Sequence, residues 1–176
     1  TEQAYYIASA ADKVYLNPEG EMEFNGLSVE VSFFKKMFDK LDIKPQIFRV
    51  GDFKSAVEPL MVDKMSNQNK LQLNELISDL HHTILQDISK SRNISYDDLK
   101  RMADKMSVTD TKSALQFGLV DSLFYFDQVQ DNLRKRLGLA KDEDINFIKF
   151  GKYKKSLSVY EASKNEIAVI VADGDI

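Results

Sequence analysis

FRVGDFKSAVEP, residues Phe48 to Pro59, lies between two segments with contrasting patterns. The run QIFRV at Gln46–Val50, which overlaps its first three residues, is rich in β-favouring residues and predicts a strand. After it, apolar residues recur at three- and four-residue spacing from Asn67 to Ser91, which predicts a long amphipathic helix. A strand, a short connection and a helix in this order indicate the α/β fold class.

The same patterns recur along the rest of the chain. Further helices are expected at Ala4–Ala11, Ser28–Leu41, Ser95–Met106, Thr109–Phe117 and Phe126–Leu137, and further strands at Lys13–Leu16, Met22–Leu27 and Ile167–Val171. Gly118 is placed where a C′ glycine ends a helix. The polar segment Lys152–Asn165 is expected to be a linker. Helix dominates the middle of the chain, and strands alternate with it.

The composition limits the classes of function. The 176 residues, 43% hydrophobic and 30% charged, are enough for one domain with a core. The 24 basic and 28 acidic residues are interspersed and give a net charge of -4, so no nucleic-acid partner is expected. Without cysteine, disulfides and thiolate metal sites are excluded. No apolar run approaches the roughly 20 residues of a membrane span.

The two histidines do not predict a metal site. His81 and His82 are adjacent on the long predicted helix, so their side chains point about 100° apart and cannot bind one metal ion from one face. We expect a boundary and a surface histidine. The carboxylates are scattered, and no phosphate-binding or dinucleotide-binding glycine motif is present. The sequence therefore predicts no metal and no cofactor.

Lys54 is the candidate catalytic residue. Gly51 permits an unusual turn before it, Ser55 and Ala56 leave room beside it, and apolar neighbours follow. A lysine in such a pocket loses hydration, which lowers its pKa and allows the neutral amine to take a proton from a serine hydroxyl. Glu58 works against this role, because a nearby carboxylate stabilises the ammonium.

Two alternatives remain open from the residues. The first is a non-catalytic α/β assembly scaffold, in which Lys54 forms a structural ion pair with Glu58. The second is a crotonase-like acyl-CoA enzyme, which would need paired backbone amides around a thioester oxygen and a pocket for coenzyme A. No feature of the sequence demands such a pocket.

The motif residues resemble a known family. FRVGDFKSAVEP is similar to the segment around the catalytic lysine of the signal peptide peptidase A family, also called protease IV, in its long form with two tandem crotonase/ClpP-like repeats. YYIASAADKVYLNPEG (Tyr5–Gly20) and ALQFGLVDSL (Ala114–Leu123) are similar to other parts of that family, and NEIAVIVADGDI (Asn165–Ile176) is similar to the first strand of its second repeat.

The resemblance implies a fold and a domain division. Residues 1–165 are expected to be the rear part of the N-terminal crotonase/ClpP-like repeat, with a helical extension from about Asn67 to Met106. Residues 166–176 are expected to be the first strand of the C-terminal repeat. The chain is then expected to be one part of a longer polypeptide.

The resemblance also implies a division of catalytic roles. It makes Lys54 the general base of a Ser-Lys dyad in a serine endopeptidase that degrades cleaved signal peptides, with Ser55 as a residue that helps to orient it. Glu2-Gln3-Ala4 occupy the turn where the family's serine would lie, so the nucleophile is expected in the serine-bearing C-terminal repeat and this chain alone is expected to be inactive. The implied protein is a homo-oligomer, expected to be a tetramer. The resemblance also implies a membrane anchor that is absent from this chain. It implies a location at the bacterial inner membrane, with the catalytic part on the periplasmic side.

Overall fold

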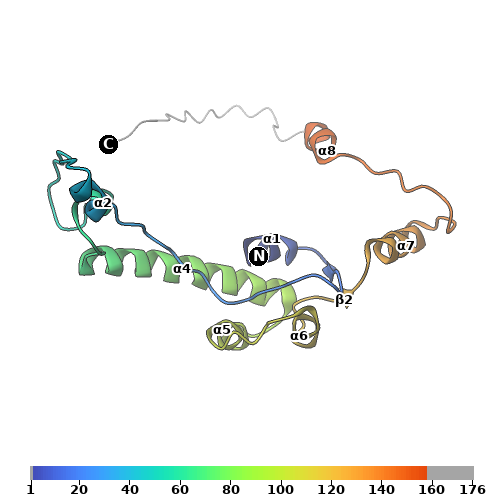
Figure 1. The fold of residues 1–176 in the computed structure, drawn as a ribbon. Helices are drawn as coiled ribbons and strands as arrows, with labels where there is room; N and C mark the ends of the chain where they lie inside the picture. Colours follow the sequence, from blue (N-terminus) through green and yellow to red (C-terminus); the bar gives the residue numbers. More distant parts are fainter. Residues whose placement is uncertain (1, 158–176) are drawn as a thin grey trace, which may run out of the picture. The chain divides into compact units, whose positions relative to one another are not determined.

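A computed structural model describes residues 2–157 as a helix-rich α/β chain (Figure 1). The chain divides into two compact units, Thr1–Val129 and Gln130–Ile176. The helices are α1 (Glu2–Ala8), α2 (Lys35–Lys40), α3 (Glu58–Met61), α4 (Asn67–Arg92), α5 (Tyr96–Asp104), α6 (Thr111–Gln116), α7 (Phe126–Leu137) and α8 (Phe150–Ser156), and the strands are β1 (Tyr15–Leu16) and β2 (Ser122–Leu123).

The two strands form a parallel pair. Tyr15 lies opposite Ser122, and Leu16 lies opposite Leu123. The pairing extends on either side, because the amide of Asp121 donates to the carbonyl of Val14 at 2.8 Å and that of Phe124 donates to Leu16 at 2.9 Å. The sheet therefore joins the start of the first unit to a segment more than a hundred residues later.

The Asp121 carboxylate fixes one end of this pair. Its Oδ2 accepts a 2.9 Å hydrogen bond from the amide of Val14 and lies 2.9 Å from Arg92 Nη2. Its Oδ1 lies 2.9 Å from Lys13 Nζ. These contacts lower the pKa of Asp121 to about 2. The hydrogen bond from the Val14 amide has the largest effect, and Lys13 and Arg92 add to it.

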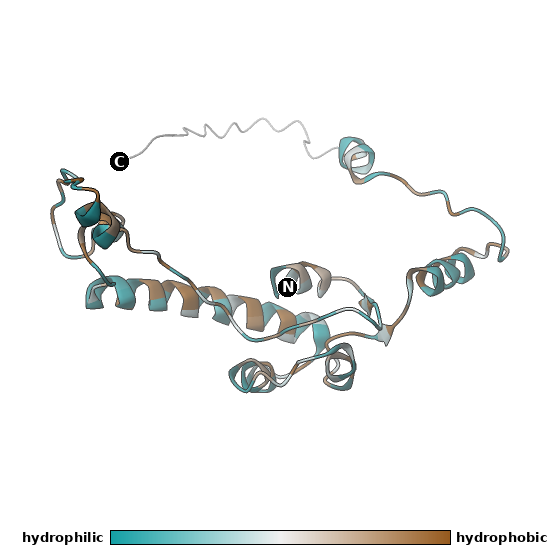
Figure 2. Cartoon of the chain, viewed as in Figure 1, coloured by the Kyte–Doolittle hydropathy of each residue, from teal (hydrophilic) through white to brown (hydrophobic). Residues whose placement is uncertain are grey.

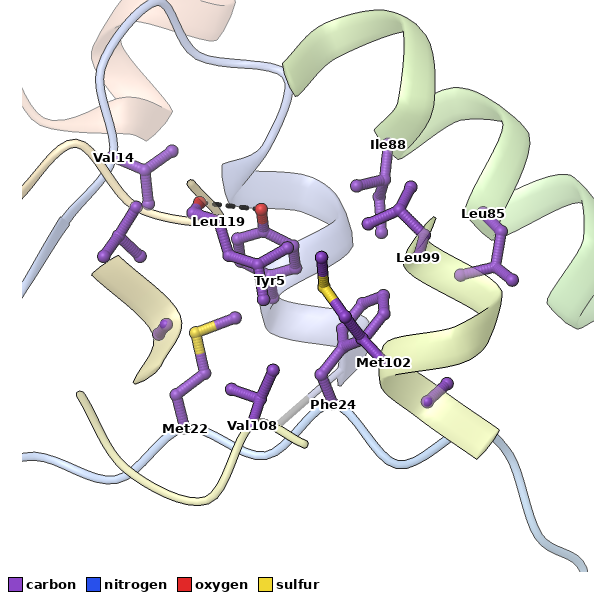
Figure 3. Close-up of a cluster of buried hydrophobic side chains, with 13 residues drawn as sticks. Tyr5, Val14, Met22, Phe24, Leu85, Ile88, Leu99, Met102, Val108 and Leu119 are labelled. Carbon is purple, nitrogen blue, oxygen red and sulfur yellow. Dashed lines mark hydrogen bonds between the residues drawn. The ribbon is translucent and has the colours of Figure 1, made fainter. Parts of the chain in front are cut away.

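The hydrophobic core of the first unit lies where α1, α5, α6 and the end of α4 meet (Figure 3). Its buried members are Tyr5, Val14, Met22, Phe24, Leu85, Ile88, Leu99, Met102, Ala103, Val108, Ala114, Leu119 and Val120. The rings of Tyr5 and Phe24 meet edge to face, with centroids 6.1 Å apart. Met22 and Phe24 are buried without belonging to a strand, so the strand predicted at Met22–Leu27 is wrong although its apolar residues do enter the core.

Helices with a side-chain cap match the sequence predictions. Ser66 caps α4 by accepting from the amide of Asn69, and Ser95 caps α5 by accepting from the amide of Asp98. Asp110 forms a capping box at the start of α6, and Gly118 follows that helix with a φ of 75°. The predicted helix Phe126–Leu137 is α7 with the same bounds.

Three other predictions differ from the structure. The helix predicted at Ser28–Leu41 forms only as α2, because Val29 and Val31 are β-branched and Phe34 offers no side-chain cap. Gln46–Val50 is not a strand, since a strand needs a partner and none lies beside it among the described residues. The linker predicted at Lys152–Asn165 begins inside α8. The strand predicted at Ile167–Val171 lies outside the described residues.

The apolar stripe of α4 is only partly covered. Apolar residues recur along this helix (Figure 2), and those of its last turns, Leu85 and Ile88, are buried. Earlier in the helix, Leu71, Leu76 and Leu80 are each more than half exposed. Across residues 2–157, no helix has the length and apolar character needed to cross a membrane.

Candidate functional site

Lys54 lies on the loop that leads into α3. Gly51 turns the chain three residues earlier with a φ of 95°, a conformation that favours glycine. The side chain of Lys54 is exposed, and within residues 2–157 its ammonium has no hydrogen-bond or ion-pair partner. Its backbone is held instead, because Arg49 Nη1 donates to the Lys54 carbonyl at 3.2 Å.

The apolar residues around Lys54 do not enclose it. Phe48 is 95% exposed, Val50 is 90% exposed, and Phe53 is also exposed. Val57 and Leu60, which were expected to exclude water, are only half-buried. The described residues therefore do not supply the water-excluding pocket expected around Lys54.

Glu58 is buried beside this loop at the first position of α3. Its side chain is 2% exposed. Oε1 accepts a 2.5 Å hydrogen bond from the Ser66 hydroxyl, and Oε2 accepts from the Ser66 amide at 3.2 Å and from Asn69 Nδ2 at 3.0 Å. The Ser66 hydroxyl is the main cause that lowers the pKa of Glu58, and it outweighs the opposing effect of burial. Glu58 is thus a hydrogen-bonded carboxylate in a closed setting.

The cation that faces Glu58 is Arg49. Its Nη1 lies 3.6 Å from Glu58 Oε1. The scaffold alternative placed Lys54 in an ion pair with Glu58, and the structure corrects this pairing. Ser66 and Asn69 satisfy the carboxylate from the start of α4, while the Lys54 side chain remains exposed.

Ser55, which directly follows Lys54, forms its hydrogen bond elsewhere. Its hydroxyl donates to Gln72 Oε1 on α4 at 3.3 Å. This contact joins the Lys54 loop to α4 a second time, about one turn of the helix after Asn69. The expected hydrogen bond from Ser55 to Lys54 is not formed.

Glu2-Gln3-Ala4, expected to form a turn, are instead the first residues of α1, and they place a carboxylate there. Glu2 is buried, and its Oε1 accepts a 2.9 Å hydrogen bond from the amide of Gly26. A cavity of about 240 Å³ opens here, lined by Glu2, Gln3, Glu23, Asn25, Gly26, Leu27 and Ser28. Within the described part of the chain, no serine hydroxyl is hydrogen-bonded to the Lys54 ammonium. The described residues therefore present a candidate base without a nucleophile beside it.

The histidines lie as predicted, one at the edge of the apolar stripe and one on the surface. His81 is half-buried and lies against Gly26, with ring atoms 3.7 and 3.8 Å from the position that a Cβ would take. His82 is exposed, with Nδ1 3.0 Å from the Tyr96 hydroxyl. No group of metal-binding side chains occurs in residues 2–157.

The contacts of Glu58 are the part of the site that the sequence analysis did not identify. Arg49 and Asn69 flank it at separations of nine and eleven residues, and the three residues belong to no single helix or strand, so no periodic pattern links them. The available signal was the acidic residue before Pro59 at the start of a helix, followed by a serine in a capping position.

Comparison with known proteins gives consistent results. The sequence model of Peptidase family S49 matches residues 1–140. Protease 4 of Haemophilus influenzae is 34% identical over 98% of this chain and 30% of its own length, and Protease 4 of Salmonella typhi is 35% identical over 98% of this chain and 29% of its own. A protein named Serine protease SPPA, chloroplastic, from Arabidopsis thaliana is 28% identical over 98% of this chain and 26% of its own length.

The chain spans less than a third of the length of these curated relatives. The family match nevertheless covers the Lys54 loop and the resembling segments from Tyr5 to Leu123, while the resembling segment Asn165–Ile176 lies beyond it. The relatives are named as proteases of the kind that those segments resemble. This chain therefore belongs to peptidase family S49, whose fold is ClpP-like.

Proposed function

We propose that this chain supplies the general base of a serine endopeptidase, and that Lys54 is that base. The nucleophilic serine belongs to a second, C-terminal repeat of the same protein. The observation that carries the proposal is the setting of Lys54: it stands in the G-x-x-K-S-A-x-E-P string, with its backbone held and its ammonium exposed and unpaired among the described residues. Membership of a peptidase family supports the reaction class.

The proposed reaction has two steps. In the first, the neutral Lys54 amine removes the serine proton as the serine oxygen bonds to the scissile carbonyl carbon, and the resulting ammonium returns the proton to the amine that leaves when the C–N bond breaks. In the second, Lys54 removes a proton from water, whose oxygen replaces the serine oxygen on the carbonyl carbon. The serine regains its proton, and no metal or cofactor is required by either step.

The exposed surface near Lys54 supports the need for a second segment. A lysine in water is protonated at neutral pH, and removal of water is what lowers its pKa. Because Phe48 and Val50 are almost fully exposed, this surface has apolar area for another segment to cover. In the proposal, the serine-bearing repeat and the bound peptide supply that cover.

The substrates in this proposal are cleaved signal peptides, whose central region is apolar. The whole protein is proposed to be a homo-oligomer, as a tetramer, with a membrane anchor outside this chain. Its catalytic part is proposed to lie on the periplasmic side of the bacterial inner membrane. These finer statements rest on the resemblance to the signal peptide peptidase A family, with the names of the relatives in support.

The test uses the full-length protein and a peptide-cleavage assay. Lys54→Ala should lower kcat by about 10²–10⁴-fold or more, the effect of losing a positioned base. Lys54→Arg should fail as well, because a guanidinium stays protonated and cannot accept the proton. Lys64→Ala and Lys70→Ala are the matched controls, because both lysines lie at the exposed entry to α4, and they should keep near-normal turnover. Near-normal cleavage by folded Lys54→Ala protein would refute the proposal.

A further inference from the structure

The loop that carries Lys54 is fastened to α4 at its far end by one carboxylate. Glu58 lies four residues after Lys54 and accepts hydrogen bonds from the hydroxyl and amide of Ser66 and from the Asn69 side chain. Ser66 also caps α4, since its hydroxyl oxygen accepts from the amide of Asn69 at 3.1 Å. The end of the loop and the first turn of the long helix are therefore fixed by the same set of bonds.

Arg49 fastens the near end of the loop to the same carboxylate. Its Nη1 donates to the carbonyl of Lys54 at 3.2 Å and lies 3.6 Å from Glu58 Oε1. One guanidinium nitrogen thus links the backbone of the candidate base to the buried acid. These two contacts of Arg49 link residues on either side of the loop, which runs from the turn at Gly51 to the start of α3.

The Lys54 side chain has no such support of its own. It is exposed, and none of the residues 2–157 binds its ammonium. Among the described residues, the position of its backbone is therefore what limits the region that its ammonium can reach. A general base must lie within about 2.6–3.2 Å of the proton-bearing atom, so a small displacement of this backbone removes it from reach.

We infer that Glu58 is a positioning residue for Lys54, acting through Arg49, Ser66 and Asn69, a set that we call the Glu58 brace. The inference rests on the proposed function of Lys54. The brace holds the Lys54 backbone to the start of α4, so that the amine meets the serine of the second repeat in one place. Glu58 does not touch the substrate.

The brace needs an ionised carboxylate. A carboxylate accepts on both oxygens, and here it accepts hydrogen bonds from Ser66 and Asn69 while its charge pairs with Arg49 at 3.6 Å. Glutamine keeps the size of the side chain but replaces one acceptor with a donor and removes the charge that attracts Arg49. The low pKa of Glu58 is consistent with a carboxylate that stays ionised over the range in which a lysine base works.

The experiment measures kcat and KM of the full-length protein with a signal-peptide substrate, per folded molecule as determined by circular dichroism. Glu58→Gln should lower kcat by about 10- to 100-fold, the effect of a displacement on the order of 1 Å, and should leave KM within about threefold. Arg49→Lys is a milder variant, because it keeps the positive charge but its shorter side chain reaches less far toward the Lys54 carbonyl and Glu58, which Arg49 Nη1 contacts together. It should also lower kcat. The variant should fold normally, since Arg49 is one-third exposed.

Asp121→Asn is the matched control. It removes a carboxylate from another hydrogen-bonded cluster of the same unit, which holds Val14 and Arg92 and is not part of the Glu58 brace. It should lower stability but leave kcat per folded molecule unchanged. A variant at Glu58 or Arg49 that loses stability in the same way, with kcat per folded molecule intact, would overturn the positioning role.

The two proposals fail separately. If Lys54→Ala keeps normal turnover, the proposed function fails and the positioning role fails with it. If Lys54→Ala is inactive while folded Glu58→Gln and Arg49→Lys proteins are fully active, the base assignment stands and only the brace is wrong. If Glu58→Gln does not fold, the result for Arg49→Lys decides the question.

Discussion

The hydroxyl of Tyr5 donates a 2.7 Å hydrogen bond to the carbonyl of Leu119, 114 residues further along the chain. Both residues are buried in the core of the first unit. Burial raises the pKa of Tyr5 to about 12, and the nearby Arg92 opposes this effect. The phenol therefore stays protonated, as a donor, at neutral and mildly alkaline pH.

Tyr5→Phe should lower the free energy of unfolding by about 1–3 kcal/mol, because the Leu119 carbonyl loses its donor in a buried setting. Urea denaturation followed by circular dichroism measures the change. Tyr6→Phe is the matched control: its hydroxyl donates to the Asp87 carboxylate at 2.8 Å in a more exposed position, and its loss should be smaller. Equal losses of unfolding free energy in the two variants would contradict the view that burial makes the Tyr5 hydrogen bond the more stabilising of the two.

Asp121 should make stability depend on pH in the acid range. Its pKa falls from 3.8 in the unfolded reference to about 2 in the folded protein. A lowered folded pKa stabilises the protein above the unfolded value, and this stabilisation is lost as the pH falls from about 4 through 2. Allowing for partial exposure, the effect is on the order of 1–2 kcal/mol.

Unfolding curves between pH 7 and pH 2 measure this dependence. The loss of stability across the window should be smaller in Asp121→Asn than in the parent protein, because the variant has no proton to take up at this position. At pH 7 the variant should be about 2–4 kcal/mol less stable, since it leaves Arg92, which is 8% exposed, without its carboxylate. If the variant loses as much stability between pH 7 and pH 2 as the parent protein, groups other than Asp121 cause the pH dependence.

Gly118→Ala should destabilise the first unit by about 1–2 kcal/mol, because Gly118 has a φ of 75° that an alanine adopts at a cost. Space is not the cause, since the nearest atom to the added Cβ is Ile94 Cδ1 at 3.9 Å. Gly151→Ala is the control, because Gly151 lies in α8 without a positive φ or a neighbour within 4 Å. Thermal unfolding should show a lower midpoint for Gly118→Ala only.

Substitution by alanine should change the stability of the chain strongly at one phenylalanine and very little at another. Phe24 is 0% exposed in the core, so Phe24→Ala should cost about 3–5 kcal/mol in this chain. Phe48 is 95% exposed, so Phe48→Ala should change the stability of this chain by no more than about 0.5 kcal/mol. Denaturation of the 176-residue chain tests both. If Phe48→Ala is neutral here but destabilises the full-length protein, another segment covers it there.

Where the sequence contained a capping side chain, the helix was predictable. Ser66 and Ser95 each accept from an amide three residues later, and the helices α4 and α5 begin at the next residue. The apolar stripe before Leu41 has the correct period, but Phe34 provides no side-chain cap, and α2 begins seven residues later than predicted. In α2, α4 and α5, apolar periodicity therefore locates the helix, and the presence of a serine cap accounts for whether its start was predicted.

The strand and the site were harder to predict for a related reason. β-favouring residues at Gln46–Val50 form a strand only if another strand is present to pair with them, and composition carries no information about that partner. Lys54 could be selected from its motif alone. The contact between Arg49 and Glu58 could not, because it depends on how Gly51 turns the chain between them.

The parallel pairing of β1 with β2 has a consequence for synthesis of the protein. Val14 and the Asp121 carboxylate that binds its amide are separated by 107 residues. At a translation rate of about 5–20 residues per second, a ribosome needs roughly 5–20 s to add that length. During this interval α1 and β1 leave the ribosome without their partners, with the apolar ring of Tyr5 uncovered. The nascent chain is then a substrate for chaperones until β2 emerges and the core closes.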